Sequence, residues 1–281
     1  MKNMKKIGLV GIAVLAAMVI VFNACKTDGD SDDGGGHTHD WGPWVVTDAT
    51  ATEDGFETRT CTRDSAHIET RAGGSKLLAY TLNGASTEYS VSGYTGTSVS
   101  VVIPATFGGK PVKSVGVNAL INNTAISSVT IPASVESIGS SAFQECTNLT
   151  SVTFASGIQL DTIGIQAFNG CSKLTSVIIP ASVTTIDNVA FAACTKLASV
   201  TFASVSQLDT IGFQAFYACY DLASITIPAS VTTMGSQAFH NWQNTQKIIV
   251  PFVNITAMEA AWGTTATWNS GAAVIQYTPG A

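Results

Sequence analysis

The chain has 281 residues, a net charge of −6 and only 11% charged residues, less than half of the ~25% usual in soluble proteins. Serine, threonine and alanine take the place of the missing charges. Because the only dense lysines lie at the N-terminus and no basic stripe follows them, the sequence lacks the electrostatic footprint of a protein that binds nucleic acid.

Residues 1–24 predict a secretory signal peptide. Three lysines within the first six residues precede an uncharged apolar run at 7–22, as in such signals. This run of 16 residues is shorter than the ~18–20 apolar residues that a permanent membrane span needs. The sequence Phe22-Asn23-Ala24-Cys25 resembles a bacterial lipobox, which implies that Cys25 is lipidated and ties the protein to a membrane. We expect a membrane-anchored lipoprotein at the outer membrane or cell surface; simple secretion and an uncleaved anchor are the alternatives.

Residues 25–36 predict a lipid-anchored, flexible tether. After Cys25 the segment has no apolar residue and is dominated by glycine and aspartate, which favours a solvated, self-repelling spacer. An acidic stretch directly after a lipidated cysteine also resembles the surface-export signals of some bacterial lipoproteins. Periplasmic and outward-facing display therefore both stay open.

Residues 37–75 predict a small tryptophan-containing β module. The start at His39–Trp44 and the core at Glu57–Cys61 resemble a bacterial extracellular module whose cysteine-richer versions look capable of binding zinc. Here Ala51 and Asp64 stand where those versions carry cysteine. We therefore expect no metal and no other cofactor, and zinc held by the histidines and the core cysteine is the alternative.

Residues 131–250 repeat one unit five times. The sequence Ile131–Val135 recurs at Ile179 and Ile227, 48 residues apart each time, and longer versions of the unit alternate with it. An Ala-Phe pair closes every unit, with the phenylalanines at Phe143, Phe168, Phe191, Phe216 and Phe239. Self-similarity at a period of ~20–50 residues is typical of a solenoid, in which each unit buries its apolar face by stacking on its neighbours.

Each unit predicts a strand, a bend and a short helical turn. In Ser151–Phe154 valine and phenylalanine alternate with serine and threonine, the pattern of a strand with one buried face. A second apolar residue precedes a glycine, as in Ile138-Gly139, and we expect this glycine to allow a tight bend. The segment Ser141–Cys146 predicts the helical turn that closes the coil.

Four cysteines each stand three residues after a repeat phenylalanine, at Cys146, Cys171, Cys194 and Cys219. Stacked coils ~4.8 Å apart would align them in a column, at a spacing that a disulfide tolerates. Parallel side-chain directions favour buried free thiols, which behave as small hydrophobes. Disulfides are the alternative.

The pattern L-x-x-V-x-[IF]-P/A-x-S-V-x-x-I-G-x-x-A-F-x-x-C, between residues 78 and 250, resembles the BspA-type leucine-rich repeats of bacterial surface proteins. The resemblance implies a repeat solenoid of mainly short parallel β-strands with short helical turns. It implies an N-terminal cap and degenerate first repeat at 76–130, five repeats at 131–250 and a C-terminal cap at 251–281. It also implies attachment to proteins or glycans on host or neighbouring cells.

The outward strand residues predict a neutral, hydroxyl-rich face that binds ligands. Its residues are Ser128, Thr130, Ser151, Thr153, Ser176, Ser199, Thr201, Ser224 and Thr226. The leading hypothesis is adhesin-like binding of proteins or glycans, weak per unit and strengthened by multivalency. The alternative is a structural envelope or spacer protein whose Ser/Thr face is merely solvated.

The repeats offer little for catalysis. His240 stands at a surface position of the last, divergent unit. Asp161 and Asp209 occupy equivalent positions two coils apart, which favours turn residues that accept backbone hydrogen bonds over an acid–base pair. We therefore expect no enzymatic activity and no catalytic residue.

Overall fold

The computed structural model describes most of the chain from residue 78 onward and parts of the segment before it. The described residues are 40, 42, 45–47, 56–62, 68–72, 78–96, 98–252, 254–263, 269 and 272–278. The expected signal peptide at 1–24 and the expected tether at 25–36, with its lipidation site Cys25, lie outside the described residues.

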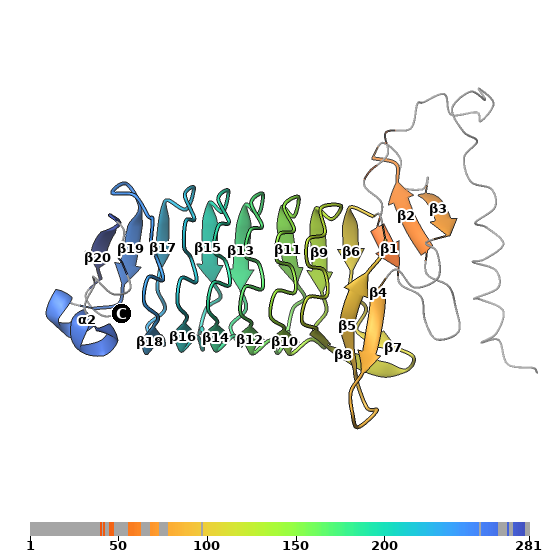
Figure 1. Ribbon diagram of the computed structural model, residues 1–281, viewed down its shortest axis with the longest axis horizontal. Coiled ribbons are helices and arrows are strands. Elements are labelled where there is room, and N and C mark those ends of the chain that lie inside the picture. Colours follow the sequence, from red (N-terminus) through yellow and green to blue (C-terminus); the bar gives the residue numbers. More distant parts are fainter. Residues whose placement is uncertain are drawn as a thin grey trace, which may run out of the picture.

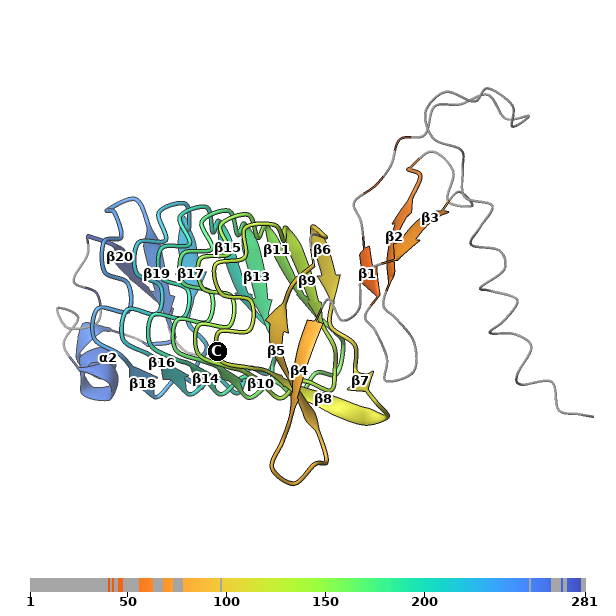
Figure 2. The same cartoon turned by 45° about the vertical axis from the view of Figure 1, so that its right-hand side comes forward.

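The chain winds into a solenoid of short parallel strands, which confirms the fold class expected from the repeats (Figure 1). The first row of strands is β6 (Ser100–Val102), β9 (Ser128–Ile131), β11 (Ser151–Phe154), β13 (Ser176–Ile179), β15 (Ser199–Phe202), β17 (Ser224–Thr226), β19 (Lys247–Val250) and β20 (Val274–Tyr277). The second row is β8 (Lys110–Val115), β10 (Ser137–Ile138), β12 (Thr162–Ile163), β14 (Thr185–Ile186), β16 (Thr210–Ile211) and β18 (Thr233–Met234). Figure 2 shows the two rows as separate sides of the solenoid.

The third side of each coil closes by consecutive turns, where the sequence predicted a short helical turn. Ser141 and Glu145 have positive φ values of 55° and 57°, so the segment cannot continue as a right-handed helix. The backbone N–H of Phe143 instead donates to the carbonyl of Ala167 in the next coil at 2.8 Å. This side is therefore held by hydrogen bonds between coils, as the two rows of strands are.

The glycine that follows every second-row strand except β14, which Asp187 follows, is placed by contact between coils. A Cβ on Gly212 would lie 2.6 Å from the backbone nitrogen of Asn188, and one on Gly235 would lie 2.3 Å from the carbonyl carbon of Gly212. Neither glycine has a positive φ. The expected role in a tight bend is therefore replaced by a steric one: without a side chain, adjacent coils approach closely.

The core is a column of phenylalanine rings that runs the length of the repeats. Successive rings are stacked with centroids 5.0–5.8 Å apart and planes within 7° of parallel, and all five are fully buried. The column consists of Phe143, Phe168, Phe191, Phe216 and Phe239. This arrangement confirms the stacking that the spacing of the Ala-Phe pairs predicted.

The N-terminal end of the second row is covered by a hairpin (Figure 2). Its strands are β4 (Leu78–Leu82) and β5 (Tyr89–Tyr94), and β7 (Thr106–Phe107) lies beside them on β8. The ring of Phe107 stacks on Tyr80 at 4.0 Å and meets Tyr89 edge-on at 5.0 Å. These aromatic residues pack against the core and protect the first edge of the sheet.

The described residues between 45 and 72 form three strands that continue the first row of strands. They are β1 (Val45–Thr47), β2 (Phe56–Thr60) and β3 (Ile68–Ala72). β2 pairs antiparallel with β1 and β3, while β1 pairs parallel with β6 through Val45 opposite Ser100. These strands are thus hydrogen-bonded to the solenoid.

A short helix covers the C-terminal end of the core. α2 (Ile255–Trp262) begins after Asn254, whose side chain accepts a hydrogen bond from the N–H of Ala257 at 3.0 Å, a standard N-cap. Its buried Trp262 donates from Nε1 to the carbonyl of Val231 at 3.0 Å. The helix therefore seals the last coil through both packing and a hydrogen bond.

Candidate ligand-binding face

The predicted hydroxyl face exists as two columns along the first row of strands. Between β9 and β11 Ser128 lies opposite Ser151 and Thr130 opposite Thr153, whereas between β13 and β15 Ser176 lies opposite Ser199 and Ile178 opposite Thr201. The exposed members are Ser151, Thr153, Ser176, Ser199, Thr201, Ser224 and Thr226, and the half-buried ones are Ser128 and Thr130. The structure thus brings all nine predicted residues to one side of the solenoid.

The side chains of this face are uncharged, and most of them are short. Ile178 interrupts the threonine column and is 63% exposed, while the first charged residue at these positions is Lys247 on β19, opposite Ser224. At the other end Ser128 donates from Oγ to the hydroxyl of Ser100 at 2.9 Å. A ligand on this face would meet hydroxyl groups and apolar carbon, but no ionic partner between β6 and β17.

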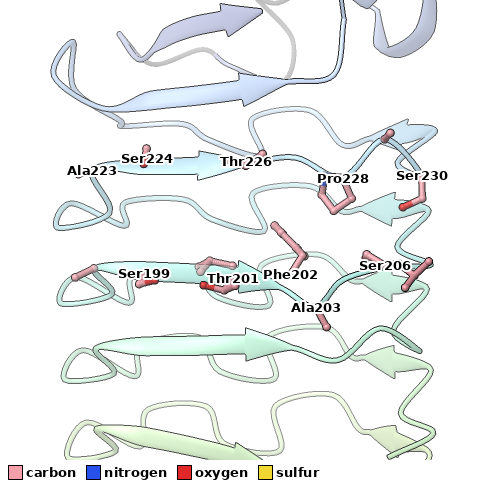
Figure 3. Close-up of a pocket in the computed structure, with 14 residues that line it drawn as sticks. Ser199, Thr201, Phe202, Ala203, Ser206, Ala223, Ser224, Thr226, Pro228 and Ser230 are labelled. Atoms are coloured by element: carbon pink, nitrogen blue, oxygen red, sulfur yellow. The ribbon is translucent and has the colours of Figure 1, made fainter. Parts of the chain in front are cut away.

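The face is interrupted between β15 and β17, a feature that the sequence analysis did not foresee. The eight-stranded sheet ends at β15, and β17 begins a separate three-stranded sheet with β19 and β20. Between them lies a groove of about 620 Å³ lined by residues drawn from 198–206 and 223–230 (Figure 3). Phe202 projects from the end of β15 toward the coil of β17 (Figure 3).

A second groove lies two coils away, at the equivalent junction. β11 and β13 are paired only through Ser151 and Ser176, and beyond that pair a groove of about 560 Å³ opens, lined by residues drawn from 152–159 and 178–182 together with Ala203 and Gln207. None of the described residues that line either groove is charged.

The two aspartates singled out in the sequence accept hydrogen bonds from threonine hydroxyls. Thr184 donates to Oδ1 of Asp161 at 2.7 Å, and Thr232 donates to Asp209 in the same way. The expectation of backbone donors is therefore wrong at these carboxylates. Each aspartate ties one coil to the next on the second row, which is a structural role.

His240 lies on the third side, away from both aspartates. Its ring stacks on Tyr217 with centroids 5.6 Å apart. Among the described residues, no group of three His, Cys, Asp or Glu side chains could hold a metal ion. The zinc alternative for the N-terminal module rests on His37, His39 and His67, which lie outside the described residues, and on Cys61, which is buried.

The cysteine column is free, buried and protonated. Each of its four thiols donates to a backbone carbonyl of the preceding coil, as Cys194 does to Phe168 at 3.2 Å. Burial raises the pKa of Cys146 and Cys219 to about 12. Burial, with the charge of neighbouring thiols added, raises the pKa of Cys171 and Cys194 well above the ordinary value. Nucleophilic chemistry needs the thiolate, so this column is suited to packing.

Comparison with known proteins identifies the repeats. Residues 113–246 match the family described as BspA type leucine rich repeat region, in six copies. The repeat region of this chain belongs to that family, and the fold is one that typically serves as a binding scaffold. The matched residues include the unit around Leu120, where leucine replaces the repeat phenylalanine.

Solved structures of bacterial leucine-rich repeat proteins are similar to this chain. The pneumococcal vaccine antigen PcpA is 27% identical with a TM-score of 0.52, over 62% of this chain and 48% of that one. A leucine rich cell surface protein from Faecalibacterium prausnitzii A2-165 is 30% identical with a TM-score of 0.45, over 62% of this chain and 53% of that one. The chain thus spans about half the length of these two proteins.

Two further findings are negative. No curated protein matches the chain. In the part of the chain that the structure describes, no helix is long and apolar enough to cross a lipid bilayer.

Proposed function

We propose that this chain is a surface-displayed, non-enzymatic lipoprotein that is anchored through Cys25 and binds proteins or glycans on host or neighbouring cells. The observation that carries the proposal is the in-register Ser/Thr face of the first row, which is exposed, uncharged and several coils long. An adhesive surface of this kind gains avidity from its length, because each additional contact forms at high effective concentration.

The core supports the same proposal. The apolar positions of the repeats point inward and are buried, as Val177 and Ile179 are on β13. The carboxylates Asp161 and Asp209 have structural partners. What the scaffold presents to solvent on the first row is therefore a regular binding surface. Anchoring through Cys25 would place that surface outside the membrane, at the end of the 25–36 tether.

The test is capture of the full chain by partner cells and their surface extracts. Thr153→Lys and Thr201→Lys place a long cation on the hydroxyl face, and we expect each to reduce capture about tenfold, since an unpaired charge must then be desolvated. Thr185→Lys and Thr233→Lys make the same change on the second row and serve as matched controls. Equal capture by all four variants, or no capture by the folded wild type, would leave the structural spacer as the better function.

A further inference from the structure

The two grooves in the hydroxyl face coincide with one sequence difference between long and short units. Where a long unit follows a short one, the N–H of its alanine donates to the carbonyl of the isoleucine in the preceding coil. These bonds run from Ala155 to Ile131 and from Ala203 to Ile179, both at 2.9 Å. In the long-to-short steps the corresponding residues are Pro180 and Pro228, which have no N–H to donate. At these same two steps β11 pairs with β13 only through Ser151 and Ser176, and β15 is not paired with β17.

The residue that loses this donor is a phenylalanine. Phe154 and Phe202 occupy the position that isoleucine takes in the short units, as at Ile179. Ile179 is fully buried, whereas both phenylalanines are only partly buried. Each groove thus combines a partly exposed aromatic ring with a backbone carbonyl that receives no ladder hydrogen bond from the next coil.

The polar groups of the grooves are neutral. Groove residues such as Ser199, Thr201 and Ser224 carry hydroxyls that both donate and accept hydrogen bonds. Ser230 lines the groove beyond β15, and its Oγ is buried without a hydrogen-bond partner. The volumes of about 620 and 560 Å³ lie within the usual range of small-ligand sites.

This chemistry favours a neutral sugar over a protein side-chain anchor. Energetic centres of protein interfaces are enriched in Trp, Tyr and Arg, and the described residues lining the two grooves include none of these. A sugar offers hydroxyls on its edges and apolar C–H groups on its faces, which match the hydroxyls and the rings of Phe154 and Phe202. An anionic glycan would find no cation in either groove.

Building on the proposed surface-binding function, we propose that the two grooves are subsites for one uncharged oligosaccharide chain that runs along the solenoid axis. The subsites lie two coils apart, at about twice the 5.0–5.8 Å spacing of the ring column. A chain long enough to reach both gains avidity from the second groove, because that contact forms at high effective concentration. Each subsite is shallow and weak alone.

The test is calorimetric titration of the full chain with cello-, manno- and chito-oligosaccharides of increasing length, with heparin oligosaccharides as the charged probe. We expect a neutral series to bind, with affinity rising until both grooves are spanned, and heparin not to bind. Phe202→Ile substitutes the short-unit residue, and Pro180→Ala with Pro228→Ala restores the missing N–H groups. We expect each of these changes to weaken binding about tenfold.

The matched control is Pro132→Ala, which makes the same substitution at a proline that lines neither groove. Three results would each overturn the subsites. The folded chain binds none of the neutral oligosaccharides, it binds heparin equally well, or the double proline variant binds as tightly as the wild type. Capture of the chain by peptides alone would also overturn them. If cells still capture the chain while no sugar binds, the sugar subsites are wrong and the proposed function stands. If the variants Thr153→Lys and Thr201→Lys are captured as well as the wild type, the proposed function itself is wrong.

Discussion

The indole of Trp242 donates a hydrogen bond from Nε1 to the carbonyl oxygen of Phe216 at 2.8 Å. Four earlier coils bind the equivalent carbonyl with a cysteine thiol, in the pairs Cys146–Leu120, Cys171–Phe143, Cys194–Phe168 and Cys219–Phe191. The tryptophan therefore takes the place of the fifth cysteine. Each of these side chains satisfies a carbonyl that would otherwise lie unpaired in the core.

Replacing Trp242 by phenylalanine tests this role. The substitution keeps an aromatic ring against Phe239, which Trp242 now meets edge-on at 5.1 Å, but it removes the donor to Phe216. Leaving a buried carbonyl unpaired costs ~1–3 kcal/mol, so the free energy of unfolding in urea should fall by about that amount. Tyr220→Phe removes an exposed hydroxyl and should change it by less than ~0.5 kcal/mol. Equal effects of the two variants would mean that the hydrogen bond contributes nothing.

The thiol column predicts a loss of stability in alkali. Because burial raises the pKa of Cys146 and Cys219 to about 12 in the folded state, while an unfolded thiol has a pKa of ~8.5, only the unfolded chain releases these protons between the two values. The stabilisation is complete below pH ~8.5 and is lost as the pH rises toward 12, by up to ~1.4 kcal/mol per pH unit for each thiol.

Urea unfolding at pH 8, 9 and 10, with proton release measured at each step, checks this prediction. The variant with alanine at all four column positions should show a flatter dependence on pH than the wild type, because lysine titration is common to both. Native thiols should also stay unreactive toward an exposed-thiol reagent until the chain unfolds. A wild type with the same pH slope as the variant contradicts the prediction.

The phenylalanine column predicts one large core effect. Phe191 is fully buried and stacks on Phe168 at 5.2 Å and on Phe216 at 5.6 Å, so Phe191→Ala should cost ~3–5 kcal/mol. The control is Phe213→Ala, because the side chain of Phe213 is 40% exposed at a corner of the coil and should lose far less. Urea denaturation compares the two. A cost below ~1 kcal/mol at Phe191 would show that the column is not the core.

The sequence predicted the parts of this fold that depend on a residue's own unit. The phase of Phe191 and Cys194 within the repeat is enough to place both inward, and the alternation in Ser151–Phe154 is enough to place the hydroxyls outward. The outward hydroxyls are confirmed because a strand's period fixes its two faces. Phe191 and Cys194 lie in the closing turns, and their burial was predicted from the repeated spacing instead. The glycine at Gly212 was recognised from its recurrence after an apolar residue, although its purpose was misjudged.

The features that the sequence analysis missed depend on how one coil meets the next. At the groove beside β15, Pro228 takes the position that Ala203 holds in the preceding unit and has no N–H for the carbonyl of Phe202. That relationship appears only when the register between coils is known. The signal was present in the alternation of long and short units, each short one carrying a proline. The closing turns were predicted wrongly because Ser141 has a positive φ. A serine in the sequence does not indicate that backbone conformation.

The backbone of the closing turns predicts a stabilising substitution. Val189 has a φ of 62°, a conformation that is strained for a β-branched residue and natural for asparagine. Val189→Asn should therefore raise the free energy of unfolding by ~1 kcal/mol. The same change at Gln166, which has a φ of 56° at the equivalent position of the preceding coil, should gain less, because glutamine is not β-branched. Thermal and urea unfolding of both variants measure the difference. If Val189→Asn is less stable than the wild type while Gln166→Asn is unchanged, packing of the valine side chain outweighs the strain in its backbone.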